Sequence, residues 1–203
     1  VKSVLVDLND AAATLPNSYN SVENITPLET PLSSTINGAA LATPVFLSLY
    51  VENDLRLDKY FAETDEKGFR KNKKAGSNNY LCTFRVGEIY LTAAEAAARL
   101  GELSQARTRL LELMRKRYAP EAYEAKSVVV NAMDKEALVQ EILDERAREL
   151  AFEGHRWFDL RRSTRPRLEK VLDGTRYVLE ENDARYTLAI PKEAIEANPG
   201  LLN

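Results

Sequence analysis

Residues 149–162 read ELAFEGHRWFDLRR and decide the fold of this chain. The stretch contains the only Trp and the only His of the sequence and surrounds them with acidic and basic side chains. Gly154 stands in its middle, where we expect it to break or bend a helix. Upstream, Asp134 is a good helix N-cap. A long helical segment is therefore predicted over residues 134–162.

Apolar residues in this segment recur at three- and four-residue spacing, the period of an amphipathic helix. They form two stripes of i,i+4 neighbours on one broad face: Leu138, Ile142 and Leu150 in the first, and Val139, Leu143, Ala147 and Ala151 in the second. Asp144 with Arg148, and Glu153 with Arg156, are spaced for ion pairs along a helix. Each such pair is worth ~0.3 kcal/mol when exposed.

Residues 84–118 predict two helices joined by a short turn at Gly101. Ser104 is expected to cap the second helix through its hydroxyl. The stretch from Tyr90 to Ala106 approximates the tetratricopeptide pattern, in which small residues stand where two antiparallel helices approach closely. The apolar positions at helical spacing are Val86, Ile89, Tyr90, Ala93, Ala94 and Ala97 in the first helix, and Leu110, Leu111 and Met114 in the second.

Outside these helices the sequence predicts irregular structure and one hairpin. Residues 1–80 are rich in Pro, Ser, Thr and Asn, and within them we expect one short helix over residues 45–61. Near the C-terminus, residues 177–179 and 186–190 are β-formers that flank a polar stretch, which predicts a β-hairpin. Pro191 is expected to end this hairpin, and residues 192–197 form a last short turn.

Composition excludes several classes of function. The 203-residue chain is 44% hydrophobic and 29% charged, as is usual for a globular protein with a buried core, and its formal net charge is -3. That charge disfavours broad attraction to nucleic acid or anionic membrane. Cys82 is the only cysteine, so no intrachain disulfide forms, and a Cys/His zinc site is excluded by counting. No stretch is apolar for long enough to span a bilayer.

Several motifs, read together and in their order, resemble the SusD/RagB family, the surface nutrient-binding lipoproteins of Bacteroidetes, and its RagB-like branch in particular. Members of this family are usually much longer and begin with a lipidated cysteine. The chain starts at Val1 without a signal peptide, so we expect it to be the C-terminal portion. The motifs are NDLRLDKYF at 53–61, FRVGEIYLTAAE at 84–95, LMRKRY at 113–118, DERARELAFEG at 144–154, the signature at 149–162, and segments 183–191 and 195–199.

The resemblance implies a mostly α fold of tetratricopeptide-like αα-hairpins with irregular loops and a small C-terminal β-hairpin. We expect one domain over residues 1–203: a loop-rich part (1–80), helical hairpins (81–162), and a hairpin with a tail (163–203). If helices that normally cover this portion lie outside the chain, apolar helix faces are expected at its surface.

The implied function is binding of a nutrient, a glycan or oligosaccharide, at the cell surface of the outer membrane. Uptake would follow through a SusC-like TonB-dependent transporter. No catalysis, cofactor, metal or nucleic acid is expected, and membrane attachment is expected only through a lipid anchor in the absent N-terminal part. Two alternatives remain open: a helical protein–protein scaffold without a small ligand, and binding of a peptide rather than a glycan.

Aromatic residues of the loop-rich part are the candidates for ligand binding, because aromatic rings on loops can stack against sugar rings. An isolated ring of this kind is equally compatible with a place in the core or at its rim. The candidates are Tyr19, Tyr50, Tyr60 and Tyr80.

The signature itself is assigned a structural role. We expect Trp157 to be buried against the preceding helices, and the charged residues around it to be bound to backbone or opposite charges, because an unpaired buried acid costs several kcal/mol. Four-residue spacing of Glu145, Glu149 and Glu153 is also compatible with paired catalytic carboxylates, but an ion network with neighbouring arginines is favoured. The structural signature residues are Glu149, Glu153, Arg156, Trp157 and Asp159.

Overall fold

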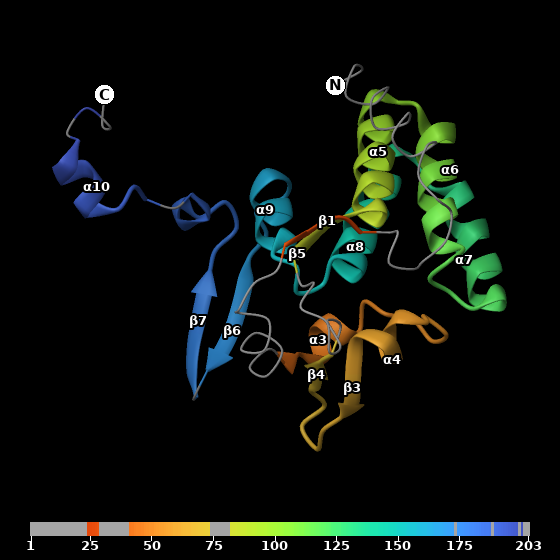
Figure 1. Ribbon diagram of the computed structural model, residues 1–203, viewed down its shortest axis with the longest axis horizontal. Coiled ribbons are helices and arrows are strands. Elements are labelled where there is room, and N and C mark those ends of the chain that lie inside the picture. The colour runs from red at the N-terminus through yellow and green to blue at the C-terminus, as the bar shows by residue number, and fades with distance from the viewer. Residues whose placement is uncertain are drawn as a thin grey trace. The chain divides into compact units, whose positions relative to one another are not determined.

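A computed structural model describes residues 24–28, 41–73, 82–172, 174–187, 189–198 and 200 (Figure 1). The chain divides into two compact units, Val1–His155 and Arg156–Asn203. The first unit contains β1 (Asn24–Leu28), β2 (Leu41–Ala42), α3 (Pro44–Leu47), α4 (Arg56–Tyr60), β3 (Phe61–Thr64), β4 (Arg70–Asn72), β5 (Cys82–Arg85), α5 (Val86–Leu100), α6 (Leu103–Met114), α7 (Pro120–Ala132) and α8 (Lys135–Glu149). Helix α9 (His155–Arg162) begins at the boundary, and β6 (Leu168–Leu172), β7 (Thr175–Leu179), the 3-10 helix η2 (Ala184–Tyr186) and α10 (Lys192–Ala197) follow.

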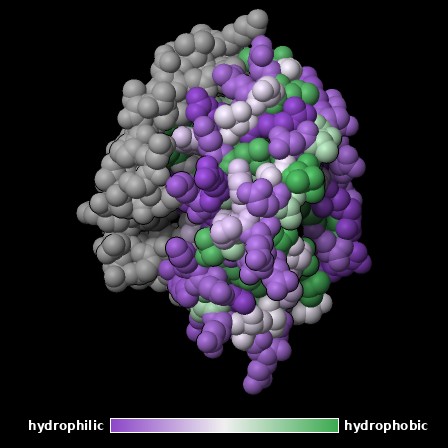
Figure 2. All heavy atoms as spheres, turned by 90° about the vertical axis from the view of Figure 1, so that its right-hand side faces the viewer, coloured by the Kyte–Doolittle hydropathy of each residue, from purple (hydrophilic) through white to green (hydrophobic). Residues whose placement is uncertain are grey.

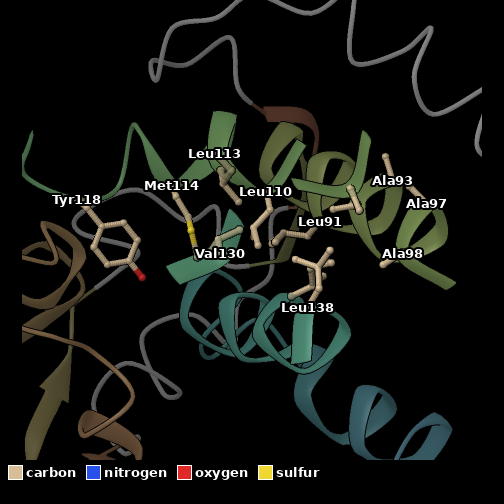
Figure 3. Packing of buried hydrophobic residues seen from close by; sticks show 13 residues of the cluster. Leu91, Ala93, Ala97, Ala98, Leu110, Leu113, Met114, Tyr118, Val130 and Leu138 are labelled. Atoms are coloured by element: carbon tan, nitrogen blue, oxygen red, sulfur yellow. The ribbon is translucent and has the colours of Figure 1, made fainter. Parts of the chain in front are cut away.

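The predicted αα-hairpin is confirmed as α5 and α6. Its turn is at Gly101, whose φ of 87° suits a residue without a Cβ. Helix α8 packs on α5 and α7 packs on α6, so four helices contribute to the main core. Small residues of α5 allow the close approach, as the tetratricopeptide pattern requires. Figure 3 shows buried residues of α5, α6, α7 and α8 pointing toward one another: Leu91, Ala93, Ala97, Ala98, Leu110, Leu113, Met114, Val130 and Leu138.

Of the two helix caps predicted from sequence, Asp134 and Ser104, only Asp134 is observed. Asp134 caps α8, and its side chain accepts a hydrogen bond of 2.9 Å from the backbone N–H of Ala137. Ser104 is not a cap, because α6 already begins at Leu103 and its N-cap residue Glu102 makes no side-chain capping bond. Helix α7, which precedes Asp134, had no counterpart in the sequence-based prediction.

The long segment 134–162 is two helices rather than one. Helix α8 ends at Glu149, and the chain then turns through Phe152 and Gly154, whose φ values of 62° and 85° are left-handed and incompatible with a continuous helix. The predicted i,i+4 pair of Asp144 with Arg148 is also replaced, because Arg148 turns inward to Glu145 and Glu141.

The single helix expected over residues 45–61 is wrong. Two short helices, α3 and α4, are separated by a turn in which Asn53 has a φ of 64°. Phe61 already begins a strand, β3, which pairs with β4; β2 pairs with the other edge of β4. Strands β1 and β5 form a separate antiparallel sheet of two strands.

A smaller core lies under these short elements. Tyr50 and Phe61 are buried there beside Ala151, and their rings meet edge to face at a centroid distance of 5.5 Å. Phe46 and Phe152 add further edge-to-face pairs with Phe61 at 6.3 and 6.0 Å. This cluster fixes the segment after α3 to the end of α8.

The second unit contains the predicted C-terminal hairpin in a different place. Strands β6 and β7 pair with Leu168 opposite Leu179 and Leu172 opposite Thr175. Of the predicted second strand, residues 186–190, the described residues form no strand. Asp183 accepts a hydrogen bond of 2.8 Å from the backbone N–H of Arg185, and this starts η2 instead of a hairpin turn. The short turn expected over residues 192–197 is α10.

Candidate functional site

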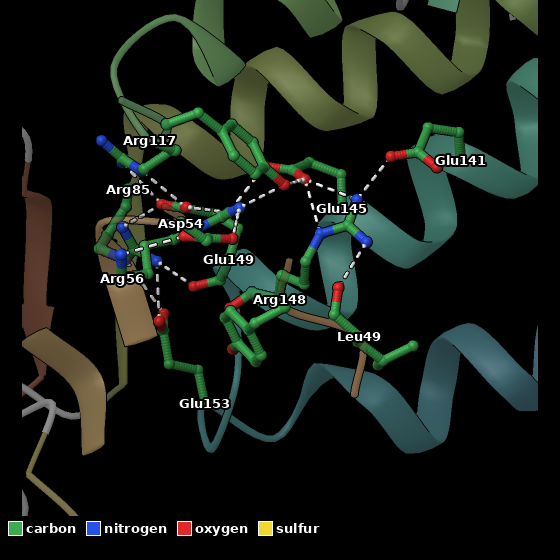
Figure 4. Close-up of polar contacts among 12 residues, drawn as sticks. Leu49, Asp54, Arg56, Arg85, Arg117, Glu141, Glu145, Arg148, Glu149 and Glu153 are labelled. Carbon is green, nitrogen blue, oxygen red and sulfur yellow. Dashed lines mark hydrogen bonds and ion pairs between the residues drawn. The ribbon is translucent and has the colours of Figure 1, made fainter. Parts of the chain in front are cut away.

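The most strongly constrained side chain of the signature is the carboxylate of Glu149, which is fully buried near the end of α8. It accepts hydrogen bonds from three arginines that come from separate parts of the chain. Arg117 approaches at 2.7 Å through both Nε and Nη2, Arg85 at 3.0 Å through Nη1, and Arg56 at 3.1 Å through Nη1 (Figure 4). Burial raises the pKa of Glu149, but Arg117 and then the other two guanidiniums hold this pKa well below its ordinary value.

Arg56 is the cation at the centre of the cluster. It is buried, and its five N–H groups donate to Asp54, Glu145, Glu149 and the hydroxyl of Tyr118 at 2.7 to 3.1 Å. Its guanidinium carbon lies 5.1 Å from the centroid of the Tyr118 ring. An arginine bound on all its donors in this way is fixed in position and has no donor left for a ligand.

Glu145, one turn before Glu149 on α8, belongs to the same network. It accepts from Arg56 at 2.7 Å and from Arg148 Nε at 2.8 Å. Burial raises the pKa of Glu145, but Arg56 and Arg148 outweigh this effect and lower the pKa to about 2. Arg148 also donates to Glu141 at 2.6 Å.

The network joins segments that are distant in sequence. Residues 53–55 run beside residues 117–119, with hydrogen bonds from the Leu55 N–H to the Arg117 carbonyl and from the Ala119 N–H to the Asn53 carbonyl. Among the described residues, each buried side-chain nitrogen and oxygen has a hydrogen-bond partner. The arrangement therefore acts as a structural clamp on α8 and offers no free acid–base pair.

The remaining signature residues are divided by the turn after α8. Glu153 pairs with Arg85 at 2.8 Å, and Arg156 is exposed. Asp159 is buried and accepts from Arg162 at 2.6 Å. His155 lies 3.7 Å from Glu88.

Trp157 departs from the expectation of full burial. It is only half-buried, and its ring stacks on Tyr186 at a centroid distance of 5.1 Å and an interplanar angle of 15°. Tyr186 is fully buried and donates its hydroxyl hydrogen to the Pro166 carbonyl. The physical reason is the turn through Gly154, which starts a new helix whose Trp meets a ring of η2.

Of the four tyrosines proposed from sequence for ligand binding, Tyr50 and Tyr60 lie within the described residues. Tyr50 is buried, and its hydroxyl donates to the backbone carbonyl of Arg148 at 2.8 Å. Tyr60 is half-buried and packs against the same small core. These positions match the core alternative for isolated rings. Tyr19 and Tyr80 lie outside the described residues.

A groove between α6 and α7 is the feature that the sequence analysis missed. Its volume is about 540 Å³, within the range of small-molecule sites. Positions on α7 line it at four-residue spacing, and this spacing was the signal that could have revealed it. The lining includes Leu111, Arg115, Tyr123, Glu124, Ser127 and Asn131.

A second groove beside α7 is apolar. It measures about 420 Å³ and lies between α7 and Val51, with Lys126 and Glu141 paired at 3.0 Å among its lining residues. Val128 and Val129 of α7 are 70% and 57% exposed. Figure 2 shows apolar residues exposed at the surface among hydrophilic ones, on the side of the molecule that faces the viewer. The first unit thus has exposed apolar side chains on a helix, as expected.

No group of three or more His, Cys, Asp and Glu side chains in the described part of the chain is placed to hold a metal ion. None of the described helices combines the length and apolar character needed to cross a membrane.

Similarity to known proteins extends over the residues that form the clamp and the two grooves. The family model described as the SusD family matches residues 46–203, which include the clamp and both grooves. A solved structure described as a SusD-like carbohydrate binding protein from Bacteroides vulgatus ATCC 8482 superposes with a TM-score of 0.59 at 19% identity. The superposition covers 94% of this chain and 50% of that one, so this chain spans half the length of that protein. The sequence matches none of the curated proteins.

Proposed function

Because this chain belongs to the SusD family, we propose that it is part of a surface protein that binds a nutrient, a glycan, for uptake. The observation that carries the proposal is the family match over residues 46–203. The neighbour described as a carbohydrate binding protein supports a glycan as the ligand class. The protein acts at the outer surface of the outer membrane, where a lipid anchor attaches it, and delivers its ligand to a SusC-like TonB-dependent transporter.

The role is binding and not catalysis. A glycosidase needs two carboxylates that reach the substrate and differ in protonation. Glu145 and Glu149 are fully buried and held by arginines, and Glu153 is bound to Arg85. Their charge is used inside the fold.

A binding titration of the full-length protein tests this function. Calorimetry is carried out with a panel of neutral and acidic oligosaccharides and, in a parallel arm, with oligopeptides of mixed sequence. We expect saturable binding of a saccharide. Chromatography of the sample after the titration should show no hydrolysis product. If the protein binds peptides and no saccharide, its ligand is a peptide and not a glycan. If a hydrolysis product forms, the non-catalytic role is wrong.

The apolar groove favours a second candidate function, docking of a partner protein on the helical face. Val128 and Val129 are exposed on α7, and the adjacent groove is largely apolar. Exposed apolar patches bordered by polar residues are typical of protein contacts. We propose the SusC-like transporter as the partner, so that docking and nutrient binding serve one uptake complex.

Co-purification of a SusC-like transporter, co-expressed with the full-length protein, tests the docking role. Val129→Asp places a charge in the groove and is expected to abolish co-purification, while Val45→Asp, at an exposed position of α3 outside the groove, leaves it intact. Equal recovery with both variants contradicts docking at this groove.

A further inference from the structure

The groove between α6 and α7 is built from two facing rows of side chains. Leu111 and Arg115 lie four residues apart along and just beyond α6, and Tyr123, Ser127 and Asn131 lie four residues apart on α7. Side chains at this spacing share one face of a helix. At 1.5 Å per residue the α7 row extends over about 12 Å, which is longer than a single sugar ring.

The polar side chains that line the groove differ in their contacts: the Ser127 hydroxyl donates to the Glu124 carbonyl at 2.8 Å and Tyr118 belongs to the clamp, whereas three others are uncommitted. Arg115, Glu124 and Asn131 make no side-chain hydrogen bond or ion pair with any residue that the structure describes. All three line the groove, and Arg115 and Asn131 are exposed. Together they offer guanidinium and amide donors with carboxylate and amide acceptors, a set that matches hydroxyl groups, which donate and accept at one atom.

Tyr123 supplies an apolar surface in the same groove. The residue is half-buried and packs against the main core cluster, which fixes its position. A fixed ring is suited to stack against the C–H face of a sugar, because little conformational freedom is lost on binding.

The charge of the lining selects among ligands. Arg115 and Glu124 carry opposite formal charges that cancel, so the groove favours neither an anion nor a cation. A neutral ligand with many hydroxyls and an apolar ring face satisfies every group present. In the apolar groove on the other side of α7, two of the three charged lining residues, Lys126 and Glu141, pair with each other.

We infer that the α6–α7 groove binds a neutral oligosaccharide, with the Tyr123 ring against one sugar ring and Arg115, Glu124 and Asn131 bonded to its hydroxyls. The inference rests on the proposed function, since it names a site and a ligand class for nutrient binding. The exposed residues Arg115 and Asn131 orient the ligand, and Ser127 lies between Tyr123 and Asn131 along α7.

Titration of the full-length protein with neutral oligosaccharides tests the site. The probes are fragments of α-glucan, β-glucan, mannan and xylan, and the affinity is measured by calorimetry. Tyr123→Ala and Arg115→Ala are each expected to weaken binding by roughly tenfold or more, as loss of a stacked ring or a bonded guanidinium should. Tyr123→Phe keeps the ring and most of the affinity.

Matched controls separate the site from the fold and from the function. Tyr177→Ala removes an exposed tyrosine from β7 and is expected to leave the affinity unchanged. Arg115→Ala and Asn131→Ala alter exposed residues, so their melting temperatures should equal that of the wild type. If the wild type binds a saccharide and the groove variants bind it equally well, the inference fails while the proposed function stands. If the wild type binds no saccharide, both fail.

Discussion

Glu149 is the residue on which the clamp depends, because its carboxylate neutralises guanidiniums from three segments. Glu149→Gln keeps the shape but leaves these charges unbalanced in a buried site. We expect a loss of about 3–5 kcal/mol in the free energy of unfolding, measured in urea. Glu112→Gln removes the same charge from a surface pair with Arg109 and should cost less than about 1 kcal/mol. Equal effects of the two variants would show that the clamp is not stabilising.

Gly87 is a second residue that the clamp requires. It is buried on α5, and a Cβ at this position would lie 3.0 Å from Oε1 of Glu149, which three arginines prevent from moving. Replacement of Gly by Ala in a helix normally stabilises by about 1 kcal/mol. Gly87→Ala is instead expected to destabilise by about 1–3 kcal/mol, through overpacking. A raised melting temperature in a thermal scan would mean that Glu149 can shift.

At the scale of the element, Asp134 and Ser104 differ in whether they cap a helix. Both residue types cap helices, but only Asp134 accepts a bond from the third residue of its helix. Asp134→Ala should therefore cost about 1 kcal/mol of unfolding free energy, and Ser104→Ala close to none. Urea unfolding of both variants checks this prediction, which fails if the two losses are equal.

Helix α9 is reported by Trp157, the only Trp of the chain. Its ring is half-buried and stacked on Tyr186. Tyr186→Leu removes the stacked ring, so we expect the indole to become more hydrated and its fluorescence emission to shift to longer wavelength. Tyr177→Ala, at an exposed position of β7, is the control and should leave the emission maximum unchanged. An unshifted spectrum for Tyr186→Leu would contradict the stack.

For the whole molecule, the clamp predicts sensitivity to acid. The pKa of Glu145 is lowered from its ordinary value of 4.5 to about 2, and that of Glu149 is also lowered. Since the folded state binds these protons more weakly than the unfolded chain, their contribution to stability is complete above about pH 5 and is lost as the pH falls through 4.5 toward 2.

The free energy of unfolding, measured in urea at a series of pH values, should be flat near pH 6 and fall by a few kcal/mol toward pH 2. Glu145→Gln removes one of the two groups and should weaken this dependence. A free energy of unfolding that rises as the pH falls would show that the ionised carboxylates of the clamp do not stabilise the fold.

The sequence by itself determined helices α5, α6 and α8 and part of the core. Periodicity is a local property, so α5, α6 and the stripes of α8 follow from residues three and four positions apart. The left-handed break near Gly154 and the cap at Asp134 are local for the same reason. The family resemblance extends over the same residues, because its motifs are the local sequences that carry these features.

Only the tertiary structure decided how the charges pair. Arg56 and Glu149 are 93 residues apart in sequence, and spacing along one helix could not identify a partner on α4. The same limit applies to Glu153, whose partner Arg85 lies before α5, and to the groove beside Tyr123, which is formed with α6. Contacts of this kind depend on which distant segments meet when apolar surface is buried, and a burial force without direction specifies no partner in the sequence.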